Sequence, residues 1–159
     1  MGCDIHIWAE RKTTNGYVAV TDVKFTEGAS PFDWRSYRMF GFLAGVSNYS
    51  DVPPISEPRG LPDDISAQVF AEFEIWELDA HTPSWLTVEE LAAFDYDQPI
   101  EDRRVTVQVA PNAWDGGRTA EPGGGEMTTW RAFLGKAFMN DLEKLKSCGA
   151  TRIVFWFDN

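Results

Sequence analysis

The spacing of apolar side chains predicts a strand at the start of the chain. Within residues 3–11 the isoleucines fall at alternate positions. Because successive side chains of a strand point to opposite faces, Ile5 and Ile7 would lie together on an apolar face. Asp4 and His6 would share the other face, which places a carboxylate beside an imidazole. This strand therefore carries the first candidate for a polar site.

Three further stretches predict strands. Asn15-Gly16 suits the positive φ of a tight hairpin turn, so residues 17–20 would return antiparallel to the first strand. Residues 104–109 alternate apolar and polar side chains, as a half-buried strand does. Residues 152–159 form a nearly continuous apolar run, which favours a strand covered on both faces. We therefore expect the last strand near the centre of a sheet.

The first predicted helix begins at a strong capping signal. Ser30 followed by Pro31 is typical of a helix start, and the helix would stop near Asn48. Gly41 and Gly45 lie one turn apart on it. A glycine inside a helix costs up to about 1 kcal/mol relative to alanine, so the pair indicates close packing against a neighbouring backbone.

Two more helices follow from a cap and from helical spacing. Thr87 and Glu90 form a capping box, which opens a helix that would run to about residue 94. Large apolar side chains recur at helical spacing over residues 130–145, and Gly149 would close that helix.

One segment stays ambiguous, and two segments are predicted to be loops. Ser66 could cap a short helix to Phe70, but the apolar residues of 73–76 also fit a strand. Residues 49–64 are rich in proline and residues 111–126 in glycine, so both are expected to be loops, the second of them mobile.

These elements predict an α+β fold. The expected architecture is a mostly antiparallel sheet with the N- and C-terminal strands near its centre and about three helices packed on one of its faces. The 159 residues, 43% of them hydrophobic, are sufficient for one globular domain over residues 1–159 with a substantial core.

Charge restricts the class of ligand. The chain has 25 acidic against 14 basic residues, a formal net charge of −11. A nucleic-acid polymer requires clustered Lys and Arg, so binding of such a polymer is disfavoured. A small anionic ligand needs only one or two arginines, and that class stays open.

The cysteines and the hydropathy pattern indicate a cytosolic location. Cys3 and Cys148 are far apart and have no metal-binding spacing, which favours two reduced thiols. No apolar run approaches the roughly 18 residues of a transmembrane helix, so no membrane association is expected. The Met-Gly-Cys start does not match a myristoylation signal, because His6 stands where Ser or Thr is required.

The chain resembles a family of small bacteriophage proteins that begin with Met-Gly-Cys-Asp-Ile-His. The resemblance covers nearly the whole chain, and it departs from the family at Thr82, where serine is common. It implies phage origin, a common fold and a location in the host cytoplasm, and it transfers no mechanism. The resembling segments are Gly2 to His6, residues 38–46, the loop Pro58 to Pro62, His81 to Leu86, and Phe155 to Asn159.

One candidate site is a metal centre. Asp4, His6 and His81 supply a carboxylate and two imidazoles, a ligand set for Zn²⁺, Mn²⁺, Fe²⁺ or Mg²⁺ that leaves positions open for water and substrate. The metal would activate a bound water for phosphoester or nucleotide hydrolysis, with Asp79 or Asp64 as base. The same side chains also fit structural roles, with His6 bonded to Asp4 and His81 supporting the next helix.

The second candidate is a binding site for a phosphorylated ligand. Arg59 is presented by a stiff proline-rich loop, and Arg38 by the first long helix. His81 and Ser84 would lie in the loop before the helix that starts after Thr87, where backbone N–H groups favour an anion.

Aromatic residues near these arginines could bind a nucleobase. Trp85, Tyr37 or Trp8 would stack on the base, and Arg35 is an alternative to Arg38 as a phosphate ligand. In the competing interpretation the arginines pair with the surplus of acids and Trp85 belongs to the core.

Three functions are consistent with these features, in order of expectation. The first is a phage protein that binds a small anionic ligand and sequesters a nucleotide signal of host defence. The second is the metal-dependent hydrolase. The third is an inhibitor whose acidic surface binds a host protein, although the acids form dense clusters only at residues 63–64, 89–90 and 95–102. The oligomeric state stays open, a homo-oligomer included.

Overall fold

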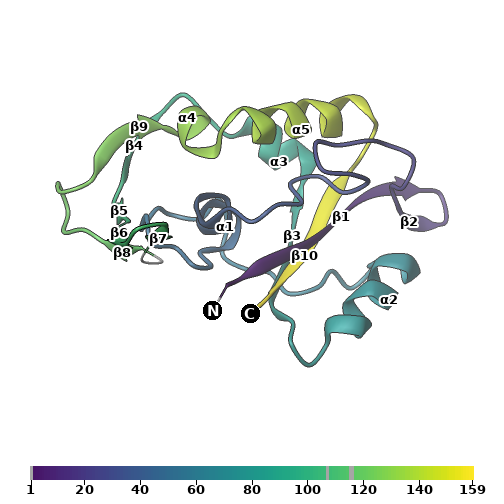
Figure 1. Cartoon of the computed structure of the whole chain (residues 1–159). Helices are drawn as coiled ribbons and strands as arrows, with labels where there is room; N and C mark the ends of the chain where they lie inside the picture. Colours follow the sequence, from purple (N-terminus) through teal and green to yellow (C-terminus); the bar gives the residue numbers. More distant parts are fainter. Residues whose placement is uncertain (1, 107, 115–116) are drawn as a thin grey trace. The chain divides into compact units, whose positions relative to one another are not determined.

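The computed structural model describes residues 2–106, 108–114 and 117–159. These residues fall into two compact units that are interleaved along the chain (Figure 1). The first unit comprises Met1–Arg35, Pro58–Phe94 and Lys136–Asn159, and the second comprises Ser36–Glu57 and Asp95–Gly135.

A four-stranded antiparallel sheet forms the centre of the first unit. Its strands are β1 (Asp4–Thr13), β2 (Gly16–Ala19), β3 (His81–Thr87) and β10 (Arg152–Asp158), in the order β2-β1-β10-β3. The first and last strands are therefore the two central ones, as predicted. The hairpin prediction is confirmed, and the α+β fold class is confirmed as well.

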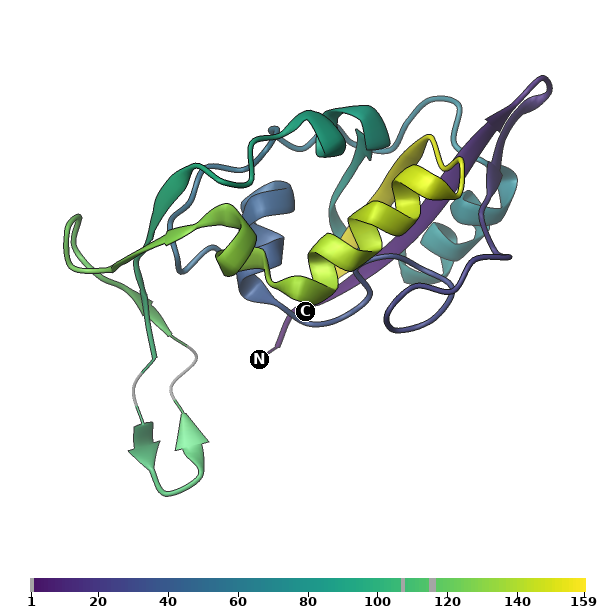
Figure 2. The ribbon, with the colours of Figure 1, turned by 90° about the horizontal axis from the view of Figure 1, so that it is seen from above.

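Helices cover both faces of this sheet, whereas the sequence predicted helices on one face. Helix α2 (Ala67–Trp76) packs against β2 and β10, and helix α5 (Lys136–Ser147) lies over the opposite face (Figures 1 and 2). Helix α3 (Val88–Ala93) contacts α5 and starts at the predicted capping box. The ambiguous segment after Ser66 is the helix that covers the second face.

The two core layers follow the alternation of β10. On the α2 face Val154 and Trp156 pack with Phe73 and Trp76. The intervening Ile153, Phe155 and Phe157 are fully buried as well, which explains the continuous apolar run. Among the described residues, no helix combines the length and apolar character that a membrane crossing requires.

The predicted helix start at Ser30 is wrong. Helix α1 (Tyr37–Ala44) belongs to the second unit and is capped by Ser36, whose side chain accepts from the Met39 N–H. Phe32 has φ 58°, and its N–H donates to the Asp141 carboxylate at 2.9 Å. The left-handed backbone at Phe32, held by this long-range bond, is incompatible with a helix that starts at Ser30.

The end of α1 also differs from its prediction. The helix ends at Gly45, a left-handed cap with φ 70°, instead of at Asn48. Gly41 does approach a neighbour closely, but the neighbour is the Asn48 side chain, whose Oδ1 would lie 2.6 Å from an added Cβ.

The rest of the second unit consists of short strand pairs and one helix. The pairs are β4 (Pro99–Asp102) with β9 (Glu126–Thr129), β5 (Arg104–Val105) with β8 (Arg118–Thr119), and β6 (Gln108–Ala110) with β7 (Ala113–Trp114). Helix α4 (Trp130–Leu134) places Trp130 against Phe42, with ring centroids 5.0 Å apart.

Three predictions in this region need correction. The strand predicted over 104–109 is divided between β5 and β6, and Val107 lies outside the described residues. The loop predicted over 111–126 contains β7 and β8. The helix predicted over 130–145 is two helices, α4 and α5, because Gly135 separates them with φ 90°.

Candidate functional site: a cation–aromatic row beside a cleft

Cationic and aromatic side chains alternate across the sheet of the first unit. The Arg152 guanidinium carbon lies 3.4 Å from the Tyr17 ring centroid and 6.0 Å from that of Trp85. Arg59 lies 4.7 Å from the Trp85 centroid, and Lys12 lies 6.0 Å from that of Tyr17. We call these five residues the cation–aromatic row.

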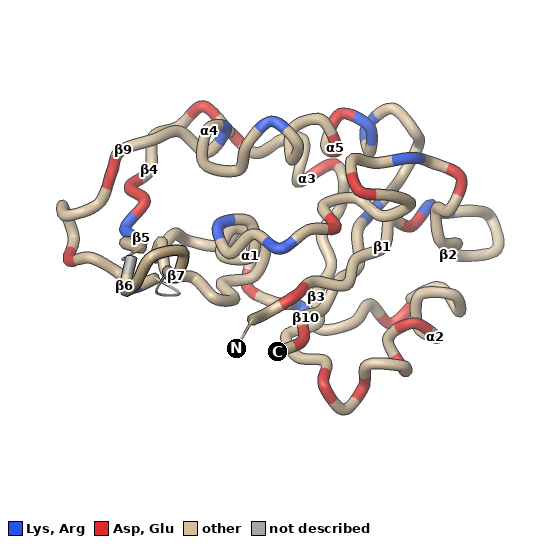
Figure 3. The backbone as a smooth tube through the Cα atoms, in the orientation of Figure 1, with Lys and Arg blue, Asp and Glu red and all other residues tan. Residues whose placement is uncertain are grey.

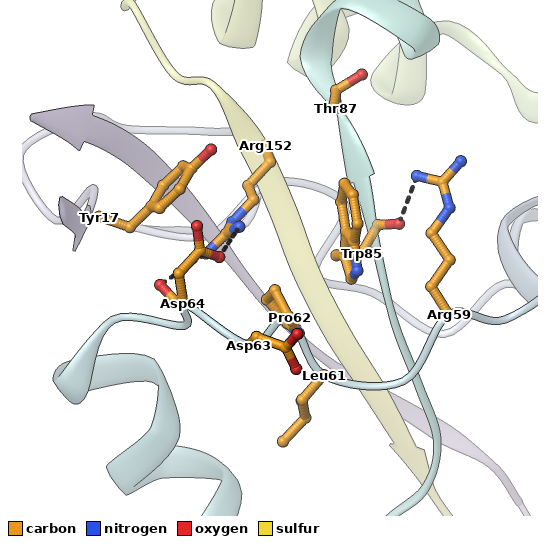
Figure 4. A pocket seen from close by; sticks show the side chains of 9 residues that line it. All are labelled: Tyr17, Arg59, Leu61, Pro62, Asp63, Asp64, Trp85, Thr87 and Arg152. Atoms are coloured by element: carbon orange, nitrogen blue, oxygen red, sulfur yellow. Dashed lines mark hydrogen bonds and ion pairs between the residues drawn. The ribbon is translucent and has the colours of Figure 1, made fainter.

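The row borders a cleft of about 640 Å³. Figure 4 shows Tyr17 and Arg152 on one side of the cleft and Trp85 and Arg59 on the other, with Asp63 between them. The volume lies within the roughly 300–1,000 Å³ that is usual for small-molecule sites. The lining residues are Tyr17, Arg59, Leu61, Pro62, Asp63, Asp64, Trp85, Thr87 and Arg152.

A buried ion pair holds Arg152 in the row. Glu10, which is opposite Arg152 in the β1–β10 register, is fully buried. The Arg152 Nε donates to Glu10 Oε1 at 2.6 Å, and Glu10 Oε2 accepts the Ser66 N–H at 2.8 Å. The Arg152 Nη1 donates to Asp64 Oδ1 at 2.7 Å, a hydrogen bond that lowers the pKa of the Asp64 carboxyl. Arg152 is therefore oriented before any ligand arrives.

Arg59 is positioned through its backbone and its side chain. Its N–H donates to the buried Ser84 Oγ at 2.9 Å, which fastens the loop to β3. Its Nη1 and Nη2 donate to the two Glu90 oxygens at 2.6 and 2.8 Å, and this fork lowers the pKa of the Glu90 carboxyl. Nη1 also donates to the Trp85 carbonyl at 3.1 Å, the bond drawn in Figure 4.

Both guanidinium groups keep donors for a ligand. A guanidinium has five N–H donors. Arg152 directs three of them at Glu10 and Asp64, and Arg59 directs three at Glu90 and Trp85. In the part of the chain that the structure describes, the other N–H groups of these two arginines have no hydrogen-bond partner. Those of Arg59, whose side chain is 28% exposed, are available to an anion, whereas those of the buried Arg152 become reachable only where a ligand displaces Asp64.

The predicted metal ligands each have a different partner. Asp4 receives two hydrogen bonds from Arg35, both 2.8 Å long, and these bonds lower the pKa of its carboxyl. His6 Nε2 lies 2.6 Å from the carboxylate of Asp158, so the expected contact of His6 with Asp4 is replaced by a cross-strand contact. His81 Nε2 lies 2.7 Å from Asn159 Oδ1. The side chains of Asp4, His6 and His81 therefore do not converge on one metal position.

Other acidic, His and Cys side chains in the described part of the chain do not supply a metal site either. Within the described ranges, no group of three or more His, Cys, Asp or Glu side chains has the arrangement of a metal site. Asp64, one of the two candidate bases, instead pairs with Arg152.

The predicted anion ligands divide between the units. Arg59, Ser84 and Trp85 come together in the first unit, although Ser84 is 1% exposed and acts by holding the Arg59 backbone. His81 and Ser84 lie in strand β3, and the prediction of a loop there is wrong. Arg38 belongs to the second unit, where it donates to Asp102 at 3.0 Å.

The remaining candidates do not join the cleft. Arg35 is engaged by Asp4, and Tyr37 belongs to the second unit, where it contacts Tyr49 with ring centroids 6.0 Å apart. Trp8 lies on the same side of the sheet as Trp85 but lines a separate, smaller cavity.

Sequence reasoning missed Lys12, Tyr17 and Arg152. One signal for Arg152 was present: it is a charged residue at the start of an apolar strand, and a buried cation needs a partner. The other signal was Glu10, at the end of the apolar half of the first strand. Pairing the two strands would have placed both charges together.

Comparison with known proteins does not identify the cleft. No family model matches the chain, and neither a curated protein nor a solved structure matches it significantly. The geometry of the first unit is what indicates a function.

Proposed function

We propose that this protein binds a small phosphorylated ligand of the nucleotide type in the cleft beside the cation–aromatic row. The observation that carries the proposal is the row itself. Three cations alternate with two aromatic rings in a chain whose net charge is −11. Guanidinium groups bind phosphate oxygens through paired donors, and they also stack on planar rings.

The cleft offers complementary groups for both parts of a nucleotide. Phosphate oxygens would accept the remaining N–H groups of Arg59 and Arg152. The base would stack along the row, and its amino groups would donate to Asp63, an exposed carboxylate in the cleft. A ligand with both an anionic and a hydrogen-bond-donating end suits this mixture of arginines and aspartates better than a simple anion does.

The ion pair between Arg152 and Asp64 is the part that a phosphate would replace. The Asp64 side chain is 66% exposed. Asp64 is the exposed partner of the pair, so its carboxylate can turn into water when a phosphate takes its place beside Arg152. Glu10 is buried and would keep Arg152 in position throughout.

The lining of the cleft has the arginines and aromatic rings that binding requires, and its groups for acid–base chemistry are Tyr17, Asp63 and Asp64. Among the described residues that line it there is no His, Cys or Ser. We infer that the protein retains its ligand unchanged, and that its biological role is the sequestration of a nucleotide signal of host defence by a phage protein in the host cytoplasm. The resemblance of the chain to small phage proteins bears only on the phage origin in this proposal; the role follows from binding without turnover.

Native mass spectrometry is the first test. The protein would be purified from cells with active nucleotide-based defences and then denatured, with the released small molecules identified. Release of an intact nucleotide would support sequestration. A bound divalent metal without nucleotide would support hydrolysis instead, and bare protein would favour the class that blocks a host protein.

A matched pair of variants tests the cleft. Titration calorimetry would compare the identified nucleotide with its nucleoside, which lacks the phosphate. We expect Arg59→Gln to weaken nucleotide binding at least tenfold. Arg131→Gln removes the same charge from an exposed pair with Asp97 in the second unit, and it should leave the affinity unchanged. Equal affinities for the two variants, or for nucleotide and nucleoside, would contradict the proposal.

A further inference from the structure

Helix α2 is apolar on its outer face as well as on the face that covers the sheet. On the inner face Val69, Phe73 and Trp76 pack with Val154 and Trp156 of β10. A helix on a sheet normally carries polar side chains on its solvent side, and a helix that is apolar on every side is normally buried. The apolar outer face therefore indicates a surface that another molecule covers.

Apolar side chains recur along this outer face at intervals of four, four and three residues, the spacing that aligns them on one side of a helix. They are all exposed, and we call them the outer stripe: Ala67, Ala71, Ile75 and Leu78. Ile75 is 71% and Leu78 99% exposed. Single exposed apolar side chains are common on protein surfaces, whereas a contiguous group of them marks an interaction site.

The outer stripe continues past the last residue of α2, because the backbone stays helical there. Glu77 has φ −44° and ψ −44°, and the Ala80 N–H donates to the Trp76 carbonyl at 2.6 Å. Leu78 is thereby held in line with the rest of the stripe. At a rise of about 1.5 Å per residue, the stripe is about 16 Å long, or roughly three turns of helix.

Acidic side chains border the outer stripe. Helical spacing places Glu74 and Glu77 along one of its sides and Glu72 along the other. Figure 3 shows acidic and no basic positions along α2, and residues 61–94 contain no Lys or Arg. Any molecule that covers the stripe must place its own groups beside these carboxylates, and cations are the groups that they attract.

We infer that the outer stripe is a docking surface for an amphipathic helix of another protein, with apolar side chains against the stripe and Lys or Arg on both flanks. A straight apolar stripe of this length matches the apolar seam of a second helix. No residue of the stripe lines the cleft, so this inference goes beyond the proposed function and does not depend on it.

Two other ways of covering the stripe conflict with its charge. A second copy of the chain would bring Glu74 and Glu77 against the acidic flanks of the other copy, and α2 has no base to neutralise them. Helices that lie on membrane surfaces carry Lys and Arg on their polar face, because many of the lipids there are anionic. The acidic flanks therefore favour a basic partner helix.

A designed peptide is the probe. It has about 18 residues, because shorter peptides form marginal helices in water, with Leu at coiled-coil spacing and Lys on both flanks. One matched peptide has Glu in place of every Lys, and another has the same composition in a scrambled order without an apolar face. In fluorescence anisotropy titrations with the full chain, the basic amphipathic peptide should bind at least about tenfold more tightly than either. Absence of its binding, or equal binding of either matched peptide, would overturn the inference.

A pair of apolar substitutions tests the location. Ile75→Gln removes an apolar side chain of the outer stripe, whereas Met127→Gln removes one that is 69% exposed in β9 of the second unit. We expect the first to weaken binding of the basic peptide about tenfold and the second to leave it unchanged. Equal effects would overturn the location. Both side chains are largely exposed, so a circular dichroism spectrum is sufficient to verify folding.

A pair of charge variants separates the flanks from the net charge. Glu74→Gln/Glu77→Gln and Glu121→Gln/Glu126→Gln each remove two exposed carboxylates, the first pair beside the stripe and the second in the other unit. Only the first double variant should weaken binding of the basic peptide, by about tenfold. Equal weakening by both would show that the attraction is that of the whole acidic chain, and it would overturn the role of the flanks.

Sedimentation velocity and vesicle flotation test the two other coverings. The unmodified chain should not form a dimer that Ile75→Gln dissociates, and it should not bind phosphatidylcholine vesicles through the same residue. The first result would assign the stripe to a second copy and the second to a membrane, and either would overturn the partner helix.

Discussion

Removal of one charge from the buried ion pair between Glu10 and Arg152 should lower the free energy of unfolding strongly. In Glu10→Gln the amide keeps the shape of the side chain and can still accept the Ser66 N–H, but the charge facing Arg152 is lost. Arg152 is 3% exposed and Glu10 is fully buried, so water cannot replace that charge. Breaking a buried ion pair by removing one partner costs about 3–5 kcal/mol.

The remaining contacts of Arg152 place the expected cost at the lower end of this range. Asp64 still accepts from Nη1 at 2.7 Å and keeps one negative charge beside Arg152, although its side chain is 66% exposed. The Tyr17 ring at 3.4 Å also attracts the guanidinium. We therefore expect Glu10→Gln to reduce the free energy of unfolding by about 3 kcal/mol, a large part of the roughly 5–15 kcal/mol of a typical domain.

Urea unfolding followed by circular dichroism measures this change. Glu143→Gln is the control, because its pair with Lys146 is exposed and its removal should change stability by less than about 0.5 kcal/mol. The double variant Glu10→Gln/Arg152→Met should be more stable than Glu10→Gln alone, since no unpaired charge is left buried. A cost below about 1 kcal/mol for Glu10→Gln, or simple additivity in the double variant, would refute the reasoning.

Three smaller effects are expected elsewhere. Burial raises the pKa of Asp33 in the folded state, so ionisation of its carboxyl opposes folding. Asp33→Asn should therefore raise the urea midpoint at pH 7 and lose this advantage below about pH 3, where the carboxyl is protonated in both states. An advantage of the same size at both pH values would contradict this. Ser36→Ala removes the cap of α1, so it should lower the free energy of unfolding in urea by about 0.5–2 kcal/mol and reduce the helical circular dichroism signal. Ser30→Ala should leave that helical signal unchanged. Gly41→Ala should lower the melting temperature, because its methyl group would meet Asn48 at 2.6 Å, and an unchanged temperature would show that Asn48 moves freely.

Local signals allowed much of the fold to be predicted. The Asn15-Gly16 turn, the Thr87–Glu90 capping box and the apolar run of the last strand depend on neighbouring residues, and the structure contains all three. The prediction at Ser30 failed because the Phe32 N–H bonds to Asp141, which is 109 residues further along the chain. No local pattern contains that information.

The residues of the cleft also divide into those with a local sequence signal and those grouped only by long-range contacts. Arg59 and Trp85 were candidates because each belongs to a conspicuous segment, and the structure brings them together. Lys12, Tyr17 and Arg152 come from three strands, and their grouping depends on strand order and register. The metal-site prediction failed in the opposite way, because it grouped residues that the fold keeps apart. Asp4, His6 and His81 bond to Arg35, Asp158 and Asn159 respectively.

The alternation of β10 places a residue of the cleft and a residue of the core on one face. Arg152 lines the cleft, and Trp156, four residues and therefore about 13 Å further along the same face, packs in the core under α2. Phe155 and Phe157 occupy the opposite face. A register shift of one residue would exchange these faces, and the cleft and this part of the core would be lost together. The apolar residues of β10 specify this register weakly, because both faces are apolar over most of the strand. The pair of Arg152 with Glu10 specifies it strongly, since only the observed register places the two charges opposite each other.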